Sequence, residues 1–221
     1  MVDARYMSRL TLRRDRGSHG VLARLLEAGA GADAHGLVWS LFADGSDRPR
    51  DFLYRETGRG EFLALSARPP DDRHDLWRVE TKEWAPMFRS GDRLQFSLRA
   101  NPVVQVRDEA GRARRHDVVM HRRTRTGGQD RREAEAEAGF DWLVERGARA
   151  GFAVRRDEVR SGGYLQHRLP RPDGRMPIRF STLDFDGMLT VTDVEAFQEA
   201  VRTGLGRSKG FGCGLLLLRR A

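Results

Sequence analysis

Apolar and polar residues follow the period of a strand in some segments of this chain and the period of a helix in others. In residues 6–12 the two kinds alternate, which is typical of a strand with one covered face. In residues 34–43 apolar side chains recur at helical spacing, so we expect a helix there. Short runs between turn residues predict further strands in the first half, at 52–56, 61–67, 76–81 and 93–100.

The pattern begins again after a break at Asn101-Pro102. A strand at 103–107 precedes a polar loop at 124–129, and a helix is expected from about 131 to 150. Further strands are expected at 152–159, 164–169 and 178–191. A last helix at 193–203 and a last strand at 213–219 complete the pattern. Thr192 and Glu195 match a capping box at the start of that last helix, and Gly204 marks its end.

The order strand-helix-strand-strand-helix-strand occurs once clearly and once roughly, and it is the order of the ferredoxin-like fold. We therefore expect an α+β protein of two tandem ferredoxin-like domains, at residues 1–98 and 103–221. A chain of 221 residues is long enough for two such domains, each with its own core.

The charge balance adds a class of partner to this picture. Lys and Arg number 40 against 32 Asp and Glu, a net charge of +8, and this balance suits a polyanionic partner such as a nucleic acid. Nearly all the cations are arginine, whose planar guanidinium matches phosphate geometry better than an ammonium group does. Because an arginine-rich composition can also reflect a GC-rich genome, the charge alone leaves both explanations open.

The single cysteine and the lack of long apolar runs indicate the cellular compartment that we expect for this protein. Cys213 alone cannot form an intramolecular disulfide or a multi-cysteine zinc site, which suits a reducing, cytoplasmic environment. The first residues are polar and charged, and the longest apolar stretch near the C-terminus is 215–218. We expect neither a signal peptide nor a membrane span.

The segment 204–214 carries the strongest functional signal. It places five glycines, with two cations and a serine among them, between a predicted helix and a predicted strand. Glycine lets the backbone bring N–H groups up to phosphates, and the cations supply charge. The candidate anion-binding residues are Gly204, Gly206, Arg207, Ser208, Lys209 and Gly210. Their spacing matches no nucleotide-binding fingerprint, and the alternative is a glycine-rich turn that only packs the helix on the sheet.

Four segments in a fixed order carry a resemblance to a known family. They are the opening 6–10, the helix 35–42 (His-Gly-Leu-Val-Trp-Ser-Leu-Phe), the strand 51–55 and the run 204–218. Together they resemble the CasE family, the repeat-RNA endoribonucleases of the type I-E Cascade complex, within the repeat-associated (RAMP) proteins of CRISPR systems. The resemblance implies two ferredoxin-like domains that bind the stem-loop of CRISPR repeat RNA and cut at its base without a metal ion or other cofactor. It also implies that the protein keeps its product and joins other Cascade subunits.

The resemblance further implies a catalytic histidine at the start of the first helix, just before a Leu-x-Trp-x-Leu-Phe pattern. Here that position is His35, and the pattern occupies 37–42. Some family members carry a tyrosine three residues before the histidine, where this chain has Ala32, so we assign no role to that position. His19 is the alternative, if the alignment shifts across the variable loop 29–33.

Histidine also suits this chemistry on physical grounds. The attacking 2′-hydroxyl must lose a proton and the leaving 5′-oxygen must gain one, and an imidazole with a pKa of about 6.5 can serve both steps near neutral pH.

Asp184 and Asp186 are interpreted as the end of a strand rather than as a metal site. The remaining histidines lie in polar contexts, and we expect them to be solvated; they are His74, His116, His121 and His167.

Two arginine-rich stretches remain as candidates for RNA binding. The stretch 112–125 is interpreted as a solvated face, because runs of charge are usually exposed. The predicted hairpin 164–180 carries Arg168, Arg171 and Arg175, and the family resemblance implies that such a hairpin lies against the RNA stem. The competing interpretation of the whole chain is a RAMP subunit that binds guide RNA without cutting it.

Overall fold

The computed structural model describes residues 5–13, 32–42, 50–107, 110–128, 130–170 and 175–220, and of 32–35 only the helical backbone. The chain divides into two compact units. The first combines Met1–Met87 with Lys209–Leu215, and the second combines Phe88–Ser208 with Leu216–Ala221. The last part of the chain therefore contributes to both units.

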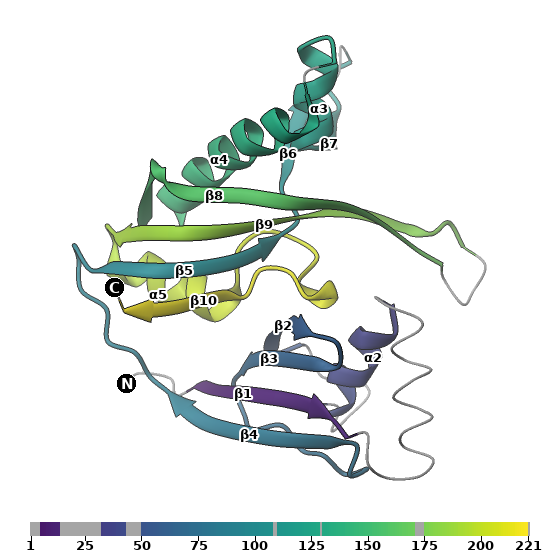
Figure 1. Ribbon diagram of the computed structural model, residues 1–221, viewed down its shortest axis with the longest axis vertical. Coiled ribbons are helices and arrows are strands. Elements are labelled where there is room, and N and C mark those ends of the chain that lie inside the picture. The colour runs from purple at the N-terminus through teal and green to yellow at the C-terminus, as the bar shows by residue number, and fades with distance from the viewer. Residues whose placement is uncertain are drawn as a thin grey trace. The chain divides into compact units, whose positions relative to one another are not determined.

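The sheet of the first unit has the strand order of a ferredoxin-like fold. Its strands are β1 (Arg5–Leu12), β2 (Phe52–Gly58), β3 (Glu61–Ser66) and β4 (Trp77–Trp84). They pair antiparallel in the order β2-β3-β1-β4 (Figure 1). Helix α2 (Ala32–Ser40) lies between β1 and β2 in the chain, whereas residues 67–76, between β3 and β4, form no helix. Within the described residues the first unit thus has one crossover helix.

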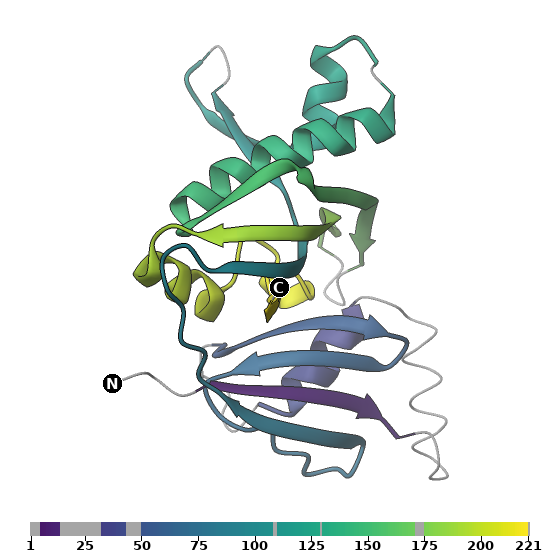
Figure 2. The same cartoon turned by 60° about the vertical axis from the view of Figure 1, so that its left-hand side comes forward.

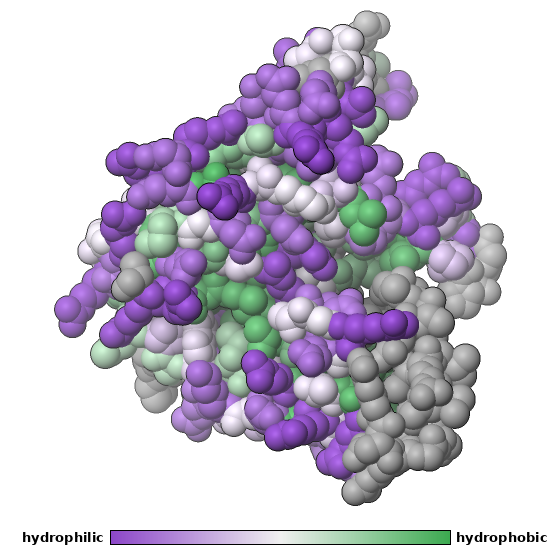
Figure 3. Space-filling model, in the orientation of Figure 1, coloured by the Kyte–Doolittle hydropathy of each residue, from purple (hydrophilic) through white to green (hydrophobic). Residues whose placement is uncertain are grey.

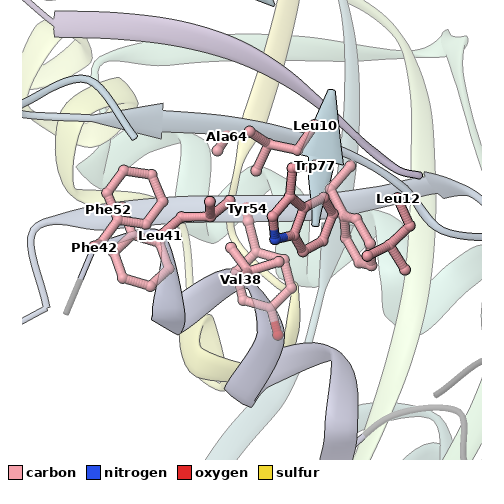
Figure 4. Packing of buried hydrophobic residues seen from close by; sticks show 10 residues of the cluster. Leu10, Leu12, Val38, Leu41, Phe42, Phe52, Tyr54, Ala64 and Trp77 are labelled. Carbon is pink, nitrogen blue, oxygen red and sulfur yellow. The ribbon is translucent and has the colours of Figure 1, made fainter. Parts of the chain in front are cut away.

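The core of the first unit lies between α2 and the sheet (Figure 4). Leu10 and Leu12 reach it from alternate positions of β1, and Val38 reaches it from α2. The rings of Phe42 and Phe52 stack beside them, with centroids 4.3 Å apart. The alternation that predicted the first strand and the spacing that predicted the first helix both place their apolar side chains in this core.

The second unit contains a complete ferredoxin-like arrangement. Its strands are β5 (Arg93–Ala100), β8 (Phe152–Leu169), β9 (Ile178–Val191) and β10 (Leu216–Arg220), and they pair antiparallel in the order β10-β5-β9-β8. Helix α4 (Arg131–Arg149) lies between β5 and β8 in the chain, and α5 (Val194–Thr203) lies between β9 and β10. The predicted α+β fold class with two ferredoxin-like sheets is therefore confirmed.

The position of β5 differs from the domain boundary that the sequence suggested. The boundary at residue 98 assigned this segment to the first domain, but β5 pairs with β9 and β10 in the sheet of the second unit. Its alternating Leu94, Phe96 and Leu98 are buried and could complete either sheet. Local pattern thus predicts the strand itself, while its partners are decided by long-range pairing.

An insertion between β5 and α4 forms a two-stranded ribbon and a helix. The ribbon consists of β6 (Val103–Arg107) and β7 (Ala113–Asp117), and α3 (Val118–Arg125) follows it directly (Figure 2). The Asp117 carboxylate caps α3, since its Oδ1 accepts a hydrogen bond from the Met120 amide at 2.8 Å. The sequence pattern predicts neither β7 nor α3, because both are short and rich in arginine.

Two predicted boundaries near the C-terminus are corrected by the structure. Helix α5 is capped by Asp193, whose Oδ1 accepts from the Ala196 amide at 3.1 Å, and not by a capping box from Thr192. The last strand begins at Leu216 rather than at 213, because a short 3₁₀ helix, η1 (Lys209–Phe211), and an irregular segment precede it. Thr192 and Asp193 are both residue types that cap helices, and the apolar run of the last strand begins before Leu216, so the sequence alone does not separate the neighbouring start positions.

The hairpin of β8 and β9 contains a position that only glycine fits. A Cβ atom on Gly187 would lie 2.2 Å from the Glu158 carbonyl oxygen and 2.9 Å from the Val159 Cα. Both neighbours are backbone atoms at a register shift of the hairpin, so they cannot move without changing the pairing. We expect Gly187→Ala to lower the free energy of unfolding by about 1–3 kcal/mol in urea titrations.

Gly162→Ala in the same hairpin is the matched control, because a Cβ there meets no atom within 4 Å. We expect this control to change the free energy of unfolding much less. Equal losses in the two variants would show that the register shift is not constrained by the Gly187 contact.

Candidate functional site

The glycine-rich segment begins as a fixed turn of the second unit. Helix α5 ends at Gly204, whose φ is 81°, and Arg207 forms an isolated backbone bridge with Asn101. The Asn101 side-chain amide donates a hydrogen bond to the Ser208 hydroxyl at 2.7 Å, and Ser208 itself has a φ of 56°. A Cβ on Gly206 would lie 3.3 Å from the Trp142 ring. The turn is therefore packed against the unit, which holds Arg207 in place.

Residues 209–215 of the same segment belong to the first unit. The 3₁₀ helix η1 packs against α2 and β2, so Lys209 lies on an element that contacts the helix of His35. The Tyr54 hydroxyl donates to the Gly210 carbonyl oxygen at 2.8 Å and ties η1 to β2. Burial raises the pKa of Tyr54, which keeps this donor protonated at neutral pH.

One cavity in the second unit brings together candidate residues from separate parts of the sequence. It has a volume of about 820 Å³, and Arg168, Arg207 and Ser208 all line it. The hairpin and the glycine-rich turn, predicted separately as binding elements, thus meet in space. Figure 3 shows hydrophilic side chains gathered over the outer part of the hairpin and over α3 and α4.

Two further arginines line the same cavity, although no motif in the sequence marks them as binding residues. Arg115 comes from β7, in the stretch that was interpreted as a solvated face, and Arg179 comes from β9. Arg179 lies directly opposite Arg168 in the hairpin, and like charges in such positions repel. The turn at Gly111 was a local signal for the ribbon, but residues 113–117 show no alternation, and nothing local predicted that Arg115 would meet the hairpin.

The four guanidinium groups of this cavity have no carboxylate partner among the described residues; they belong to Arg115, Arg168, Arg179 and Arg207. Asp117 also lines the cavity, but it accepts a hydrogen bond from Ser181 and caps α3. Positive charge is therefore in excess here, and an anion with several oxygen atoms would match it.

The remaining predicted residues are distributed differently. Arg175 is exposed, just before β9, and it is not among the residues that line the cavity. Arg171 and His19 lie outside the described residues. His35 lies in the helical backbone of α2, as the family resemblance implied, and its side chain is outside the described part of the structure.

His167 differs from the solvated histidine that the sequence predicted. Its ring is half-buried and stacks on Phe180, with centroids 4.5 Å apart and planes 13° apart. Its Nε2 lies 3.0 Å from the Thr182 hydroxyl oxygen. Burial and the nearby Arg99 lower the pKa of His167, so the ring is neutral at pH 7. His74 and His116 are exposed, as expected, whereas His121 is half-buried.

The described residues offer no metal site and no membrane-spanning helix. No three His, Cys, Asp or Glu side chains within them are grouped closely enough to hold a metal ion. Asp184 is instead paired with Arg99, through two contacts of 2.8 Å. No described helix is both long and apolar enough to cross a bilayer.

Comparisons with known proteins give the same fold over nearly the whole chain. The CRISPR endoribonuclease Cse3 bound to a 19-nucleotide RNA matches with a TM-score of 0.71 and 22% identity, covering 98% of both chains. Cas6e from Escherichia coli K-12 matches with a TM-score of 0.59 and 24% identity, covering 98% of this chain and 100% of its own. These likenesses establish the fold alone.

Sequence relationships add the family. The CRISPR system Cascade subunit CasE of Escherichia coli (strain K12) is 31% identical over 189 residues, which are 83% of this chain and 89% of that protein. A family model described as CRISPR associated protein matches residues 5–220. Because both relationships span most of the chain, it belongs to the family of CRISPR-associated proteins that includes CasE.

Proposed function

We propose that this chain is an endoribonuclease that binds the stem-loop of CRISPR repeat RNA and cuts once at the base of the stem. The observation that carries the proposal is the cluster of guanidinium groups around one cavity of a chain related to CasE. Such a cluster suits a polyanion, and RNA supplies phosphates in a row. After cleavage the protein stays with its product as a subunit of a Cascade-type complex.

The RNA's own 2′-hydroxyl makes the cut, without a metal ion. It attacks the adjacent phosphorus, and the bond from phosphorus to the 5′-oxygen breaks. The upstream fragment then carries a 2′,3′-cyclic phosphate, and the downstream fragment carries a 5′-hydroxyl. His35 acts as the acid or base in this exchange, a role that typically contributes about 10²–10⁴-fold. Lys209, on the element that packs against α2, stabilises negative charge on the phosphate.

The proposed division of roles follows the two units. The first unit carries His35 and Lys209 and performs the chemistry, while the second unit binds the stem through the hairpin and the turn at Arg207. Gly204, Gly206 and Gly210 shape the backbone around these cations. Arg175, exposed just before β9, adds positive charge to the hairpin, and Arg171 is a further RNA-binding candidate from the sequence alone.

Incubation of the protein with labelled repeat stem-loop in EDTA tests the proposed function. We expect one cut at the base of the stem, and we expect the fragments to stay bound. An RNA that is bound but never cut, with or without magnesium, would instead identify a non-catalytic RAMP subunit. A scrambled RNA without the stem is the control for specificity.

The proposed phosphate contacts predict a change in the salt dependence of RNA binding. We expect neutral substitution of Arg168, Arg175, Arg207 or Lys209 to weaken binding and to make the slope of log affinity against log salt shallower. The change per lost contact is about 0.7 to 0.9, the expectation from counterion release. Salt titrations of a labelled stem-loop measure both quantities.

Matched controls exist on the first sheet. Lys82→Ala removes the only other lysine of the chain, and Arg78→Ala removes an exposed arginine of the same strand, β4. Both controls should keep the wild-type slope. If all four test variants also keep it, their side chains do not contact RNA phosphates.

A further inference from the structure

The arginine-lined cavity has features that a phosphate-binding surface does not need. Its volume of about 820 Å³ falls within the range of about 300–1,000 Å³ that is typical of pockets for small molecules. Val103, Ile178 and Phe180 give it an apolar wall beside the guanidinium groups. A site for a continuous duplex backbone would be an open charged groove, whereas an apolar wall beside cations suits a base that carries its own phosphate.

The stacked rings of His167 and Phe180 provide a planar surface in this wall. Both residues line the cavity, and both are half-buried rather than enclosed. Because the pKa of His167 is lowered, its ring is neutral and behaves as an aromatic plane rather than as a cation. Unpaired RNA bases bind proteins by stacking on such planes, which paired bases inside a stem cannot do.

An unsatisfied acceptor in the wall indicates a ligand that donates hydrogen bonds. Asn101 lines the cavity and is 6% exposed, and its Oδ1 has no hydrogen-bond partner among the described residues. A buried acceptor without a donor destabilises the protein, because it has lost its hydrogen bonds to water. A backbone phosphodiester has no hydrogen to donate at neutral pH, whereas a base amino group or a ribose hydroxyl has one.

The ribbon places Arg115 on the cavity side. Arg115 and Arg114 are neighbours in β7, so their side chains point to opposite faces of the ribbon. Arg115 lines the cavity together with His116 and Asp117, which follow it towards the end of β7, whereas Arg114 does not. The ribbon is held beside the hairpin by Asp117, which accepts a hydrogen bond from Ser181 of β9.

We propose that this cavity binds one unpaired nucleotide next to the stem, with its base against Phe180 and His167 and its phosphate on Arg115. The proposal rests on the proposed function, because it takes the bound RNA to be the stem-loop. In this proposal the ribbon of β6 and β7 takes part in RNA recognition through Arg115, although its sequence shows only a run of charged residues. Within the cavity it assigns the base to Phe180 and His167 and leaves Arg168 and Arg207 to the phosphates of the stem.

An abasic scan coupled to protein variants tests this inference. Each unpaired position next to the stem is replaced in turn by an abasic nucleotide, and affinity is measured for the wild type and for Phe180→Leu. This variant keeps apolar volume but removes the aromatic plane. We expect one position at which the abasic RNA loses about 5- to 150-fold in affinity, the usual worth of one stacked base. At that position Phe180→Leu should add no further loss, because base and ring act as a pair.

Arg115→Ala and Arg114→Ala complete the test as a matched pair. We expect Arg115→Ala to weaken binding of the intact RNA and Arg114→Ala to leave it near the wild-type value. The inference would be overturned if Arg115→Ala and Arg114→Ala had equal effects on affinity. It would also be overturned if the abasic substitution and Phe180→Leu caused independent losses of affinity at every position. Neither result would affect the proposed cleavage of the stem-loop. A wild-type protein that does not bind the stem-loop would overturn the proposed function as well.

Discussion

His35→Ala is expected to slow single-turnover cleavage of the repeat stem-loop by at least about 100-fold and to leave RNA affinity nearly unchanged. The substitution removes the group that exchanges protons with the 2′-hydroxyl or the 5′-oxygen. It removes none of the arginines and not the lysine that are proposed to bind phosphate. Single-turnover rates at saturating protein, together with a filter-binding titration of the same variant, separate the two effects.

Two other histidines serve as comparisons for this prediction. His19→Ala tests the alternative assignment, and His74→Ala removes an exposed histidine of the first unit. We expect both to cut at nearly the wild-type rate. Normal cleavage by His35→Ala together with a large loss in His19→Ala would transfer the catalytic role to His19.

A single 2′-deoxy substitution just upstream of the cut should leave the RNA bound but uncut. The reaction as proposed uses that hydroxyl as its nucleophile, so no other group in the RNA can replace it. Because the nucleophile belongs to the substrate, the loss is expected to be complete rather than partial. The measurement is the fragment yield after prolonged incubation, with affinity determined on the same RNA.

The position of the deoxy sugar provides the control. Moving it one nucleotide downstream leaves the nucleophile in place, and that RNA should be cut at the normal rate. Cleavage of the upstream deoxy RNA would contradict the mechanism, because it would require an external nucleophile such as a metal-activated water.

Most of the sheet strands could be predicted because their signals are local. In β1 and β5, alternate side chains are buried, and the alternation is visible in the sequence. The long helix α4 likewise buries one apolar stripe, which includes Ala138 and Trp142. The membership of β5 in the second sheet could not be predicted in this way, since it depends on pairing with strands far along the chain.

The insertion was missed for a different physical reason. The segment 113–125 is polar, and α3 buries little more than Val118 and Val119. Its stability depends on the Asp117 cap and on packing against α4, neither of which has a long hydrophobic period. A short capped helix of this kind resembles a charged loop when only periodicity is considered.

The residues that line the arginine-rich cavity could be predicted in part, because some of their signals lie in motifs. Arg207 and Ser208 were found from the glycine-rich segment, and Arg168 from the hairpin. Arg115 and Arg179 were not found, because only the fold brings them into the same cavity. The half-buried stack of His167 on Phe180 could not be predicted either, because it depends on the register of two paired strands.

The chemistry of the cut ends distinguishes attack by the 2′-hydroxyl from hydrolysis by a metal-activated water. Wild-type protein is incubated with repeat stem-loop in EDTA, and the masses of both fragments are determined. We predict a 2′,3′-cyclic phosphate on the upstream fragment and a 5′-hydroxyl on the downstream fragment. A 3′-hydroxyl with a 5′-phosphate, formed only when magnesium is added back, would contradict a metal-independent attack by the 2′-hydroxyl.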